Sequence, residues 1–297
     1  MAQEAEYLSK SVKILSPAKL NLYLEVLHKR QDGYHNISTL FERISLSDEI
    51  TIKETSANCI VIKSDSKDIP WDRRNLAYKA AALLKDGLQI KKGVVIEIKK
   101  RIPVGAGLGG GSSNAASVLL GLNKLWNLKL SQKKFFEYGS CLGSDVAFFL
   151  SGASFAIGSG RGEKIKPLAH FKKKFWHIIV VPDIMVSTQG IYRKLDNLRR
   201  KSALNKTAGI SARQFSKGQD VSLENIIFNR LEEATFKRYP RVKELKEALL
   251  KRGVKNTAMS GSGGAVFGVV NSRKEGIKVL RSFKQDKDTV AFVVRTL

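Results

Sequence analysis

The sequence predicts a protein of two α+β domains, and three observations support this fold class. The chain has 297 residues, about twice the length of a typical domain. It contains 43% hydrophobic and 27% charged residues, which is ordinary for a globular protein and excludes a disordered or collagen-like chain. Strand-like and helix-like segments are mixed along it without strict alternation. We expect domains at residues 1–160 and 161–297, because residues 158–166 are rich in glycine, serine and charge.

Strand patterns dominate the first third of the chain. Residues 12–27 are mostly apolar, and residues 44–53 and 59–63 alternate with the period of two expected for half-buried strands. We expect a further strand at residues 94–98. Helices are expected at residues 75–85, at 112–125 and, with Ser131 as its N-cap, at 131–138.

The second half has fewer regular patterns. We expect strands at residues 178–181, 265–270 and 289–295, and helices at 241–252 and 273–283. Residues 194–219 are polar and contain few apolar side chains, which predicts a mobile excursion instead of core.

The charge balance is the unusual feature of the composition. The chain has 52 Lys and Arg against 27 Asp and Glu, a formal net charge of +25. Such an excess favours anionic partners, either nucleic acid or small phosphorylated molecules. The basic residues are scattered, with no long block interleaved with aromatic residues of the kind that single-strand binders show. Solvated surface is the simpler interpretation of most of them.

The cysteines and the N-terminal residues indicate in which cellular compartment the protein is expected. Cys59 and Cys141 are far apart and have no metal-ligand spacing, which suits a reducing compartment. The first residues lack the apolar segment of a secretory signal, and no apolar stretch is long enough to span a bilayer. We therefore expect a soluble, cytoplasmic protein.

A glycine-rich turn is the most informative local feature. Residues 103–116 read PVGAGLGGGSSNAA, and five of the seven positions 105–111 are glycine. Glycines allow the backbone to approach a ligand closely, and the helix that follows offers unpaired N–H groups, so the turn is suited to binding phosphate. A tight turn with a serine N-cap is the alternative. The candidate phosphate-binding residues are Pro103, Gly105, Gly107, Leu108, Gly109, Gly110, Gly111, Ser112 and Ser113.

Three familiar nucleotide-binding patterns do not fit this turn. A dinucleotide-binding fold needs an acidic residue about 20 positions further on, but no Asp or Glu lies between Glu97 and Glu137. A Walker A loop needs a lysine before its serine, and here Ser112 follows Gly111. The glycine loop of protein kinases continues into a strand, whereas the residues after Ser113 have a helical pattern.

The remaining pattern, P-x-G-x-G-L-G-x-x-S-S, resembles the second motif of the GHMP kinase superfamily of small-molecule kinases. SPAKLNLYL at residues 16–24 resembles the first motif, and MSGSGGAVFG at residues 259–268 resembles the third. DGYH at 32–35 and GSDVAFF at 143–149 are similar to the branch that acts on a cytidine diphosphate ester. The resemblance spans residues 14–270.

This resemblance implies a fold and an activity. The fold would be the two-domain GHMP arrangement, a ribosomal-protein-S5-like N-terminal domain and a ferredoxin-like C-terminal domain, with the active site between them. The activity would be ATP-dependent phosphorylation of the 2-hydroxyl of a cytidyl diphosphate sugar alcohol in non-mevalonate isoprenoid precursor synthesis. ATP is then a co-substrate and Mg²⁺ is implied. No dedicated metal ligand is evident, although Ser112 or Ser113 is a candidate.

Two charged residues are the catalytic candidates. Asp145 lies between a glycine turn and an apolar run, where it can act as the base or as the N-cap of a helix. Lys19 interrupts an apolar strand, where an unpaired charge is costly, unless the side chain reaches solvent at a strand edge. The resemblance implies that Asp145 is the catalytic aspartate and that Lys19 pairs with it.

The candidate substrate-binding residues come from several segments. Asn21 shares a strand face with Lys19, and the resemblance puts it beside the reacting hydroxyl. The resemblance also implies that His35 recognises cytosine and that Tyr34 and an aromatic residue of the second domain sandwich it. Asn75 and the cluster at 99–101 are expected near ATP. The substrate-binding candidates are Asn21, Tyr34, His35, Thr188, Tyr192 and Gly263.

Two other functions have to be compared with this one. A GHMP kinase for homoserine, mevalonate or galactose has no cytosine to recognise, so the DGYH segment argues against it. An RNA-binding protein would suit the net charge but would leave the glycine-rich turn, Lys19 and Asp145 without a function. We therefore expect small-molecule substrates, no nucleic-acid or membrane partner, and a monomer or weak homodimer.

Overall fold

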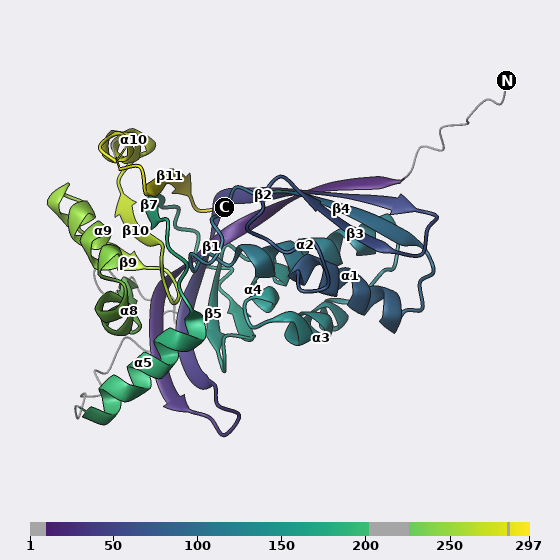
Figure 1. Cartoon of the computed structure of the whole chain (residues 1–297), viewed down its shortest axis with the longest axis horizontal. Helices are drawn as coiled ribbons and strands as arrows, with labels where there is room; N and C mark the ends of the chain where they lie inside the picture. Colours follow the sequence, from purple (N-terminus) through teal and green to yellow (C-terminus); the bar gives the residue numbers. More distant parts are fainter. Residues whose placement is uncertain (1–9, 202–225, 284–285) are drawn as a thin grey trace.

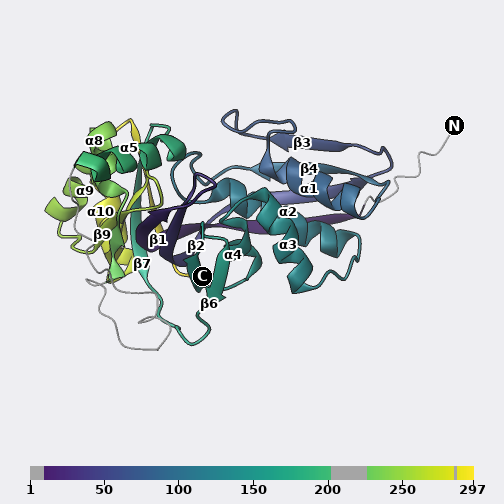
Figure 2. The same cartoon turned by 90° about the horizontal axis from the view of Figure 1, so that it is seen from below.

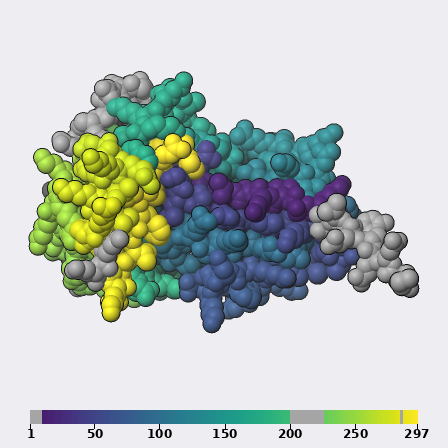
Figure 3. All heavy atoms as spheres, turned by 90° about the horizontal axis from the view of Figure 1, so that it is seen from above, coloured from purple at the N-terminus to yellow at the C-terminus, as the bar shows by residue number. Residues whose placement is uncertain are grey.

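The computed structural model describes residues 10–201, 226–283 and 286–297. Strands in these residues form a seven-stranded and a four-stranded sheet (Figure 1). Helices accompany both sheets, so the α+β class expected from the sequence is confirmed. In the space-filling view, the yellow C-terminal residues lie directly against blue residues of the larger sheet (Figure 3).

The larger sheet is built on two long antiparallel strands, β1 (Ser11–Lys29) and β2 (His35–Thr55). β4 (Gly93–Lys99) pairs antiparallel with β2, and β3 (Ile60–Ser64) lies parallel to β4. The hairpin of β5 (Phe155–Ser159) and β6 (Lys164–Pro167) joins β2 through β5. The two-residue strand β8 (Phe228–Asn229) pairs parallel with β1.

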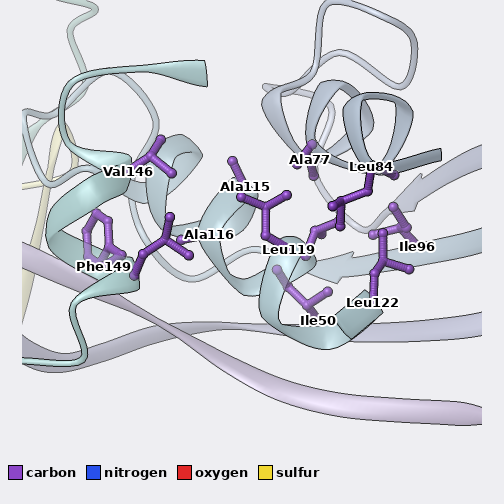
Figure 4. Packing of buried hydrophobic residues seen from close by; sticks show 14 of the residues in the cluster. Ile50, Ala77, Leu84, Ile96, Ala115, Ala116, Leu119, Leu122, Val146 and Phe149 are labelled. Atoms are coloured by element: carbon purple, nitrogen blue, oxygen red, sulfur yellow. The ribbon is translucent and has the colours of Figure 1, made fainter. Parts of the chain in front are cut away.

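Four helices cover one face of this sheet: α1 (Leu76–Gly87), α2 (Gly110–Leu125), α3 (Gln132–Leu142) and the short α4 (Val146–Leu150). Figure 2 views the molecule from this helical side. Ile50 and Ile96 of the sheet pack against Leu84, Leu119 and other apolar side chains of α1 and α2 (Figure 4). The close packing depends on Gly121, because a Cβ there would lie 2.5 Å from Ile52 Cδ1.

The smaller sheet contains β7 (Trp176–Pro182), β9 (Thr257–Met259), β10 (Val266–Val270) and β11 (Thr289–Arg295). Its order is β11-β7-β10-β9, with antiparallel neighbours. α9 (Pro240–Lys251) precedes β9, and α10 (Arg273–Arg281) lies between β10 and β11. This β-α-β-β-α-β order is that of a ferredoxin-like domain. Two further helices, α5 (Thr188–Lys201) and α8 (Glu232–Arg238), follow β7 and precede α9 along the chain.

A shared apolar core joins the two sheets. One buried cluster contains Leu20 and Ile44 of the larger sheet together with Ile179 and Phe267 of the smaller sheet. Residues of both sheets are therefore held against each other by one continuous core. The expected domain boundary at residue 160 stays a prediction, since the larger sheet continues through β6 and also recruits β8 from the C-terminal half.

Most strands and helices expected from the sequence are present, and α2 begins two residues earlier than expected. The interpretation of residues 194–219 was wrong for its first part, because residues 194–201 continue α5. Ile191 and Leu195, one helical turn apart, are fully buried and anchor that helix. The remainder, from residue 202, lies outside the described residues. Within the described ranges, no helix combines the length and apolar character needed to cross a bilayer.

Candidate active site

A cavity of about 690 Å³ lies where the two sheets meet. Its walls come from β1, the start of β2, the glycine-rich turn before α2, the turn before α4, the β5–β6 turn, α5 and the loop after β9. The sequence-predicted residues that line it are Lys19, Asn21, Tyr34, His35, Gly107, Gly109, Ser112, Asp145, Thr188 and Tyr192.

Lys19 and Asp145 form an ion pair in the lining of this cavity. Lys19 Nζ lies 3.6 Å from Asp145 Oδ2, and their side chains are 4% and 31% exposed. Burial lowers the pKa of Lys19, and the charge of Asp145 offsets part of that effect. Lys19 Nζ also donates to Asn21 Oδ1, and Asn21 Nδ2 donates to Thr39 Oγ1 at 2.8 Å. The ammonium is therefore held in one position beside a partly exposed carboxylate.

The alternative role of Asp145 as a helix cap finds no support. Asp145 is at the residue before α4, but its side chain makes no capping hydrogen bond. Its carboxylate faces Lys19 and the cavity instead. A lysine that reaches solvent at a strand edge is likewise not observed, because the Lys19 side chain is buried and its backbone N–H donates to the Leu108 carbonyl.

The glycine-rich turn is bonded to the loop after β9. Gly105, Gly107 and Gly109 have φ values of +69°, +76° and +71°, in the left-handed region that favours glycine. Ser260 Oγ donates to the carbonyl of Gly107 at 3.0 Å, and the backbone N–H of Ala265 donates to the carbonyl of Ala106, also at 3.0 Å. The second and third glycine-rich motifs thus form one wall.

The other residues of the predicted phosphate turn lie around this wall. Leu108 is buried in the core, and its carbonyl accepts from the backbone N–H of Lys19. Gly110 and Gly111 open the first turn of α2, and Gly105 is exposed. Pro103 lines a second hollow, beside Lys100 and Arg101.

The two serine candidates differ. Ser112 is half-buried and lines the cavity, whereas Ser113 is fully buried and receives a hydrogen bond from Ser16 Oγ at 2.8 Å. The structure therefore brings only Ser112 to the cavity. Among the residues described, no cluster of three or more His, Cys, Asp or Glu side chains is arranged to hold a metal ion.

The buried carboxylate of Asp48 stabilises the glycine-rich turn through hydrogen bonds on both sides of it in the chain. Asp48 Oδ1 accepts the backbone N–H groups of Arg101 and Ile102 at 2.8 and 2.9 Å. Asp48 Oδ2 accepts from Lys100 Nζ and from Asn114 Nδ2. Asp48 thus ties the residues before the turn to the first turn of α2, a role that sequence reasoning missed.

Aromatic residues also line the cavity. The rings of His35 and Tyr192 are stacked, with centroids 5.3 Å apart and planes 29° apart. Tyr34 is 57% exposed and does not pair with Tyr192. Burial raises the pKa of the Tyr192 hydroxyl, and the charge of Asp145 raises it further. His35 and Tyr192 are thus the two rings in contact, and the expected sandwich of cytosine by Tyr34 and Tyr192 stays a prediction.

His35 is held by a residue that sequence reasoning did not single out. Its Nε2 lies 2.7 Å from Asp196 Oδ1, and Lys29 Nζ donates to Asp196 Oδ2 at 2.9 Å. Burial acts to raise the pKa of Asp196, but the hydrogen bonds from Lys29 and His35 bring it below the usual value. Tyr192 and Asp196 are four residues apart on α5, so one helix face carries both contacts to His35.

Of the remaining candidate residues, some line the cavity and others do not. Thr188 Oγ1 lies 2.8 Å from Ser262 Oγ at the cavity wall. Gly263 does not line the cavity, because it packs against Met259 and Thr235, whereas its neighbours Gly261 and Ser262 do line it. Asn75 caps α1, accepting from the N–H of Ala77.

The arrangement suits phosphoryl transfer to an alcohol. A carboxylate beside an ammonium lies at one end of a cavity whose wall is a glycine-rich turn leading into a helix. Residues 75–153 match the family described as GHMP kinases N terminal domain, and residues 203–288 match GHMP kinases C terminal. The class of protein defined by this fold and site is the GHMP kinases.

Relatives of known name show to which family of GHMP kinases the chain belongs. The chain is 42% identical over 286 residues to 4-diphosphocytidyl-2-C-methyl-D-erythritol kinase of Geobacillus sp. (strain WCH70), covering 96% of each chain. It is 40% identical to the enzyme of that name from Enterococcus faecalis (strain ATCC 700802 / V583), covering 95% of this chain and 98% of the relative. The chain belongs to the family of 4-diphosphocytidyl-2-C-methyl-D-erythritol kinases.

Solved structures agree with this assignment. A crystal structure of 4-(cytidine 5'-diphospho)-2C-methyl-D-erythritol kinase matches with a TM-score of 0.76 at 33% identity, covering 95% of this chain and 99% of the other. The structure of L. major mevalonate kinase in complex with R-mevalonate has a TM-score of 0.72 at 16% identity, covering 97% of each chain. That second likeness shows the shared fold alone.

Proposed function

We propose that this protein transfers the γ-phosphoryl group of ATP to the 2-hydroxyl of 4-diphosphocytidyl-2-C-methyl-D-erythritol, giving the 2-phosphate and ADP. The reaction is a step in the non-mevalonate route to isoprenoid precursors. The observation that carries the proposal is the presence, in one cavity, of the Lys19–Asp145 pair and the group of Tyr34, His35 and Tyr192. A substrate with a base at one end and a hydroxyl at the other fits such a cavity.

Asp145 is the proposed base. Its carboxylate is partly exposed to the cavity, so a bound hydroxyl can reach it and pass it a proton as the oxygen attacks phosphorus. Lys19 is proposed to keep that carboxylate oriented and to stabilise the negative charge that develops on the transferring group. Asn21, which accepts a hydrogen bond from Lys19, fixes the position of the ammonium.

The glycine-rich turn is the proposed site for the phosphates of ATP. Gly107, Gly109 and Ser112 line the cavity, and α2 directs its first N–H groups toward the same end. The hollow beside Pro103, Lys100 and Arg101 adjoins this turn and is the proposed place for the rest of the nucleotide.

Mg²⁺ fits this site as an ion bound mainly by the substrate phosphates. The cavity offers the carboxylate of Asp145 and the hydroxyl of Ser112, and Mg²⁺ is commonly held by one or two protein oxygens plus phosphate and water. Bound there, the ion would neutralise phosphate charge. Ser113 is unsuited to this role because it is fully buried and bonded to Ser16.

Base recognition is proposed for His35, Tyr34 and Tyr192. Cytosine offers a flat face for stacking and an edge with hydrogen-bonding groups, which aromatic rings and an imidazole can match. Asp196 and the Tyr192 ring hold the His35 imidazole in place. Thr188 and Ser262 are proposed to contact the sugar alcohol end of the substrate.

The cellular context follows from this proposal. We infer a cytoplasmic enzyme with small-molecule substrates and no nucleic-acid partner, in which the net charge of +25 attracts anionic substrates. A monomer or weak homodimer is the state we expect.

The decisive experiment supplies the purified protein with ATP, Mg²⁺ and the cytidyl substrate and measures ADP. Phosphorus NMR of the product then identifies which hydroxyl carries the new phosphate. Asp145→Asn is the control that excludes a contaminating kinase. ADP formation with homoserine or mevalonate, and none with the cytidyl substrate, would reject the proposed function.

A further inference from the structure

Arg161 places a cation on the wall of the active-site cavity. It lies in the turn between β5 and β6 and lines the same cavity as Asp32 and Asp145. Asp32 pairs with Arg30 at 3.0 Å and Asp145 with Lys19 at 3.6 Å. Within the part of the chain that the structure describes, no carboxylate lies within ion-pair distance of the Arg161 guanidinium, and its charge acts on Asp32 only from further away.

The turn that carries Arg161 has a defined conformation. Gly160 and Gly162 have φ values of +69° and +109°, which an L side chain rarely adopts. Glu163 Oε2 accepts the backbone N–H of Arg161 at 2.6 Å. The N–H of Ile37, two residues after His35, donates to the carbonyl of Gly160 at 2.7 Å. The turn is therefore fixed to the start of β2.

Arg161 lies between Tyr34 and the residues around Asp145. Its guanidinium carbon is 5.0 Å from the centroid of the Tyr34 ring. The next residue, Gly162, is so close to the catalytic carboxylate that a Cβ there would lie 3.7 Å from Ser144 Cβ and 3.9 Å from Asp145 Oδ1. In a cytidyl diphosphate ester, the diphosphate likewise lies between the base and the sugar alcohol.

We propose that Arg161 binds the diphosphate group of the cytidyl substrate. This inference rests on the proposed function and adds to it a residue that determines substrate specificity. A guanidinium offers planar, paired N–H donors that match phosphate oxygens, and its charge strengthens those hydrogen bonds. Lys19 is not available for this contact, since its ammonium is bound to Asp145 and Asn21. The Tyr34 ring beneath the guanidinium supports its position through a cation–π contact.

The test compares the binding of a ligand that carries the diphosphate with that of a ligand that lacks it. Binding of cytidine 5'-diphosphate and of cytidine is measured by titration calorimetry for the wild type, Arg161→Ala and Arg161→Lys. We expect Arg161→Ala to bind the diphosphate about 10- to 100-fold more weakly, the range for one lost charged hydrogen-bond partner, and to bind cytidine unchanged. Arg161→Lys should lie between, because it keeps the charge without the paired donors.

Lys164→Ala is the matched control. Lys164 is an exposed cation on the same hairpin and does not line the cavity, so its removal changes the net charge equally without removing the contact. This variant should bind cytidine 5'-diphosphate as the wild type does. In turnover assays, Arg161→Ala should raise the KM for the cytidyl substrate and leave the KM for ATP unchanged.

The outcomes distinguish this inference from the proposed function. If the wild type binds cytidine and its diphosphate, but Arg161→Ala weakens neither or weakens both equally, the role of Arg161 is rejected and the proposed function survives. A comparable loss in Lys164→Ala would reduce the effect to overall charge and also reject it. If the wild type binds neither compound, the proposed function fails and this inference fails with it.

Discussion

Gly107 and Ser260 are in such close contact that a Cβ added to Gly107 would lie 2.1 Å from the Ser260 carbonyl oxygen. These residues belong to glycine-rich motifs about 150 positions apart, and the Ser260 hydroxyl also donates to the Gly107 carbonyl. The absence of a side chain at Gly107 thus allows the turn before α2 and the loop after β9 to meet. The contact joins the phosphate turn to the smaller sheet.

Gly107→Ala should therefore separate the two loops and reduce activity strongly. The added Cβ meets backbone instead of a flexible side chain, and the φ of +76° is unfavourable for alanine. We expect a higher KM for ATP, together with a lower melting temperature. Kinetics and thermal unfolding of the same preparation measure both effects.

Gly111→Ala is the control for that variant. A Cβ at Gly111 would make only an ordinary contact, 3.5 Å from Leu76 Cδ1, and Gly111 lies within α2, where alanine is favourable. It should keep near-normal stability. Equal loss of stability in both variants would contradict the interpretation of Gly107 as the contact point.

The second prediction concerns the buried ammonium of Lys19. Burial places its pKa below the ordinary lysine value of 10.5 in the folded protein. Folding therefore disfavours the charged form of Lys19 relative to the unfolded chain, so the cost of burying the charge is fully present below the folded pKa. That cost disappears as the pH rises toward 10.5.

Lys19→Met should accordingly raise the melting temperature at neutral pH, and the gain should vanish as the pH approaches the lysine value. Its kcat should fall by about 10²-fold or more, because Asp145 loses the ammonium that orients its carboxylate and the site loses a cation near the developing charge. Thermal unfolding across a pH series and steady-state kinetics measure the two effects. A variant that is less stable at pH 7 than the wild type would refute the assigned burial cost.

The third prediction concerns Asp196. Asp196→Asn removes the charge that faces His35 Nε2 and Lys29 Nζ, so the imidazole loses its fixed orientation. Losing one charged hydrogen-bond partner should raise the KM for the cytidyl substrate about tenfold. The KM for ATP should not change, since the side-chain contacts of Asp196 are with His35 and Lys29 and not with the glycine-rich turn.

Glu233→Gln is a suitable control, because it removes an exposed carboxylate that pairs with Lys237 on the surface. It should leave both KM values unchanged. If Asp196→Asn raised the KM for ATP as much as that for the cytidyl substrate, a general distortion of the site would explain the result better.

Local patterns made much of this fold predictable. The alternating strands and the helix after the glycine-rich turn follow from residue spacing. The pairing of Lys19 with Asp145 was implied by the resemblance of the motifs to those of GHMP kinases. The two-residue strand β8 could not be predicted, because its pairing with Tyr23 and Leu24 is a tertiary contact. The helix α5 was overlooked because its charged residues obscured the spacing of Ile191 and Leu195.

Asp196 and Asp48 could not be predicted for the same reason. Asp196 is 161 positions from His35, and Asp48 is 66 positions from Asn114, so neither contact leaves a pattern in a local window. Asp48 lies in an alternating strand, where an acidic residue looks like a surface position, yet it is fully buried. An acidic side chain on the apolar face of a strand was the one available indication.

The last prediction tests whether Lys19 and Asp145 act as one unit. Asparagine keeps the shape of aspartate but cannot accept the hydroxyl proton, so Asp145→Asn should lower kcat by about 10²- to 10⁴-fold while both substrates still bind. A helix-capping role would predict near-normal activity, because asparagine caps as well as aspartate. The absence of a capping hydrogen bond from Asp145 favours the larger loss.

The coupling is measured by adding Lys19→Met to Asp145→Asn. The two side chains lie 3.6 Å apart, and residues in direct contact are expected to show non-additive effects. If Lys19 acts largely through the carboxylate, removing it from Asp145→Asn should cost much less activity than removing it from the wild type. Fully additive losses would mean that Lys19 stabilises the phosphoryl group independently of Asp145, and the paired mechanism would have to be abandoned.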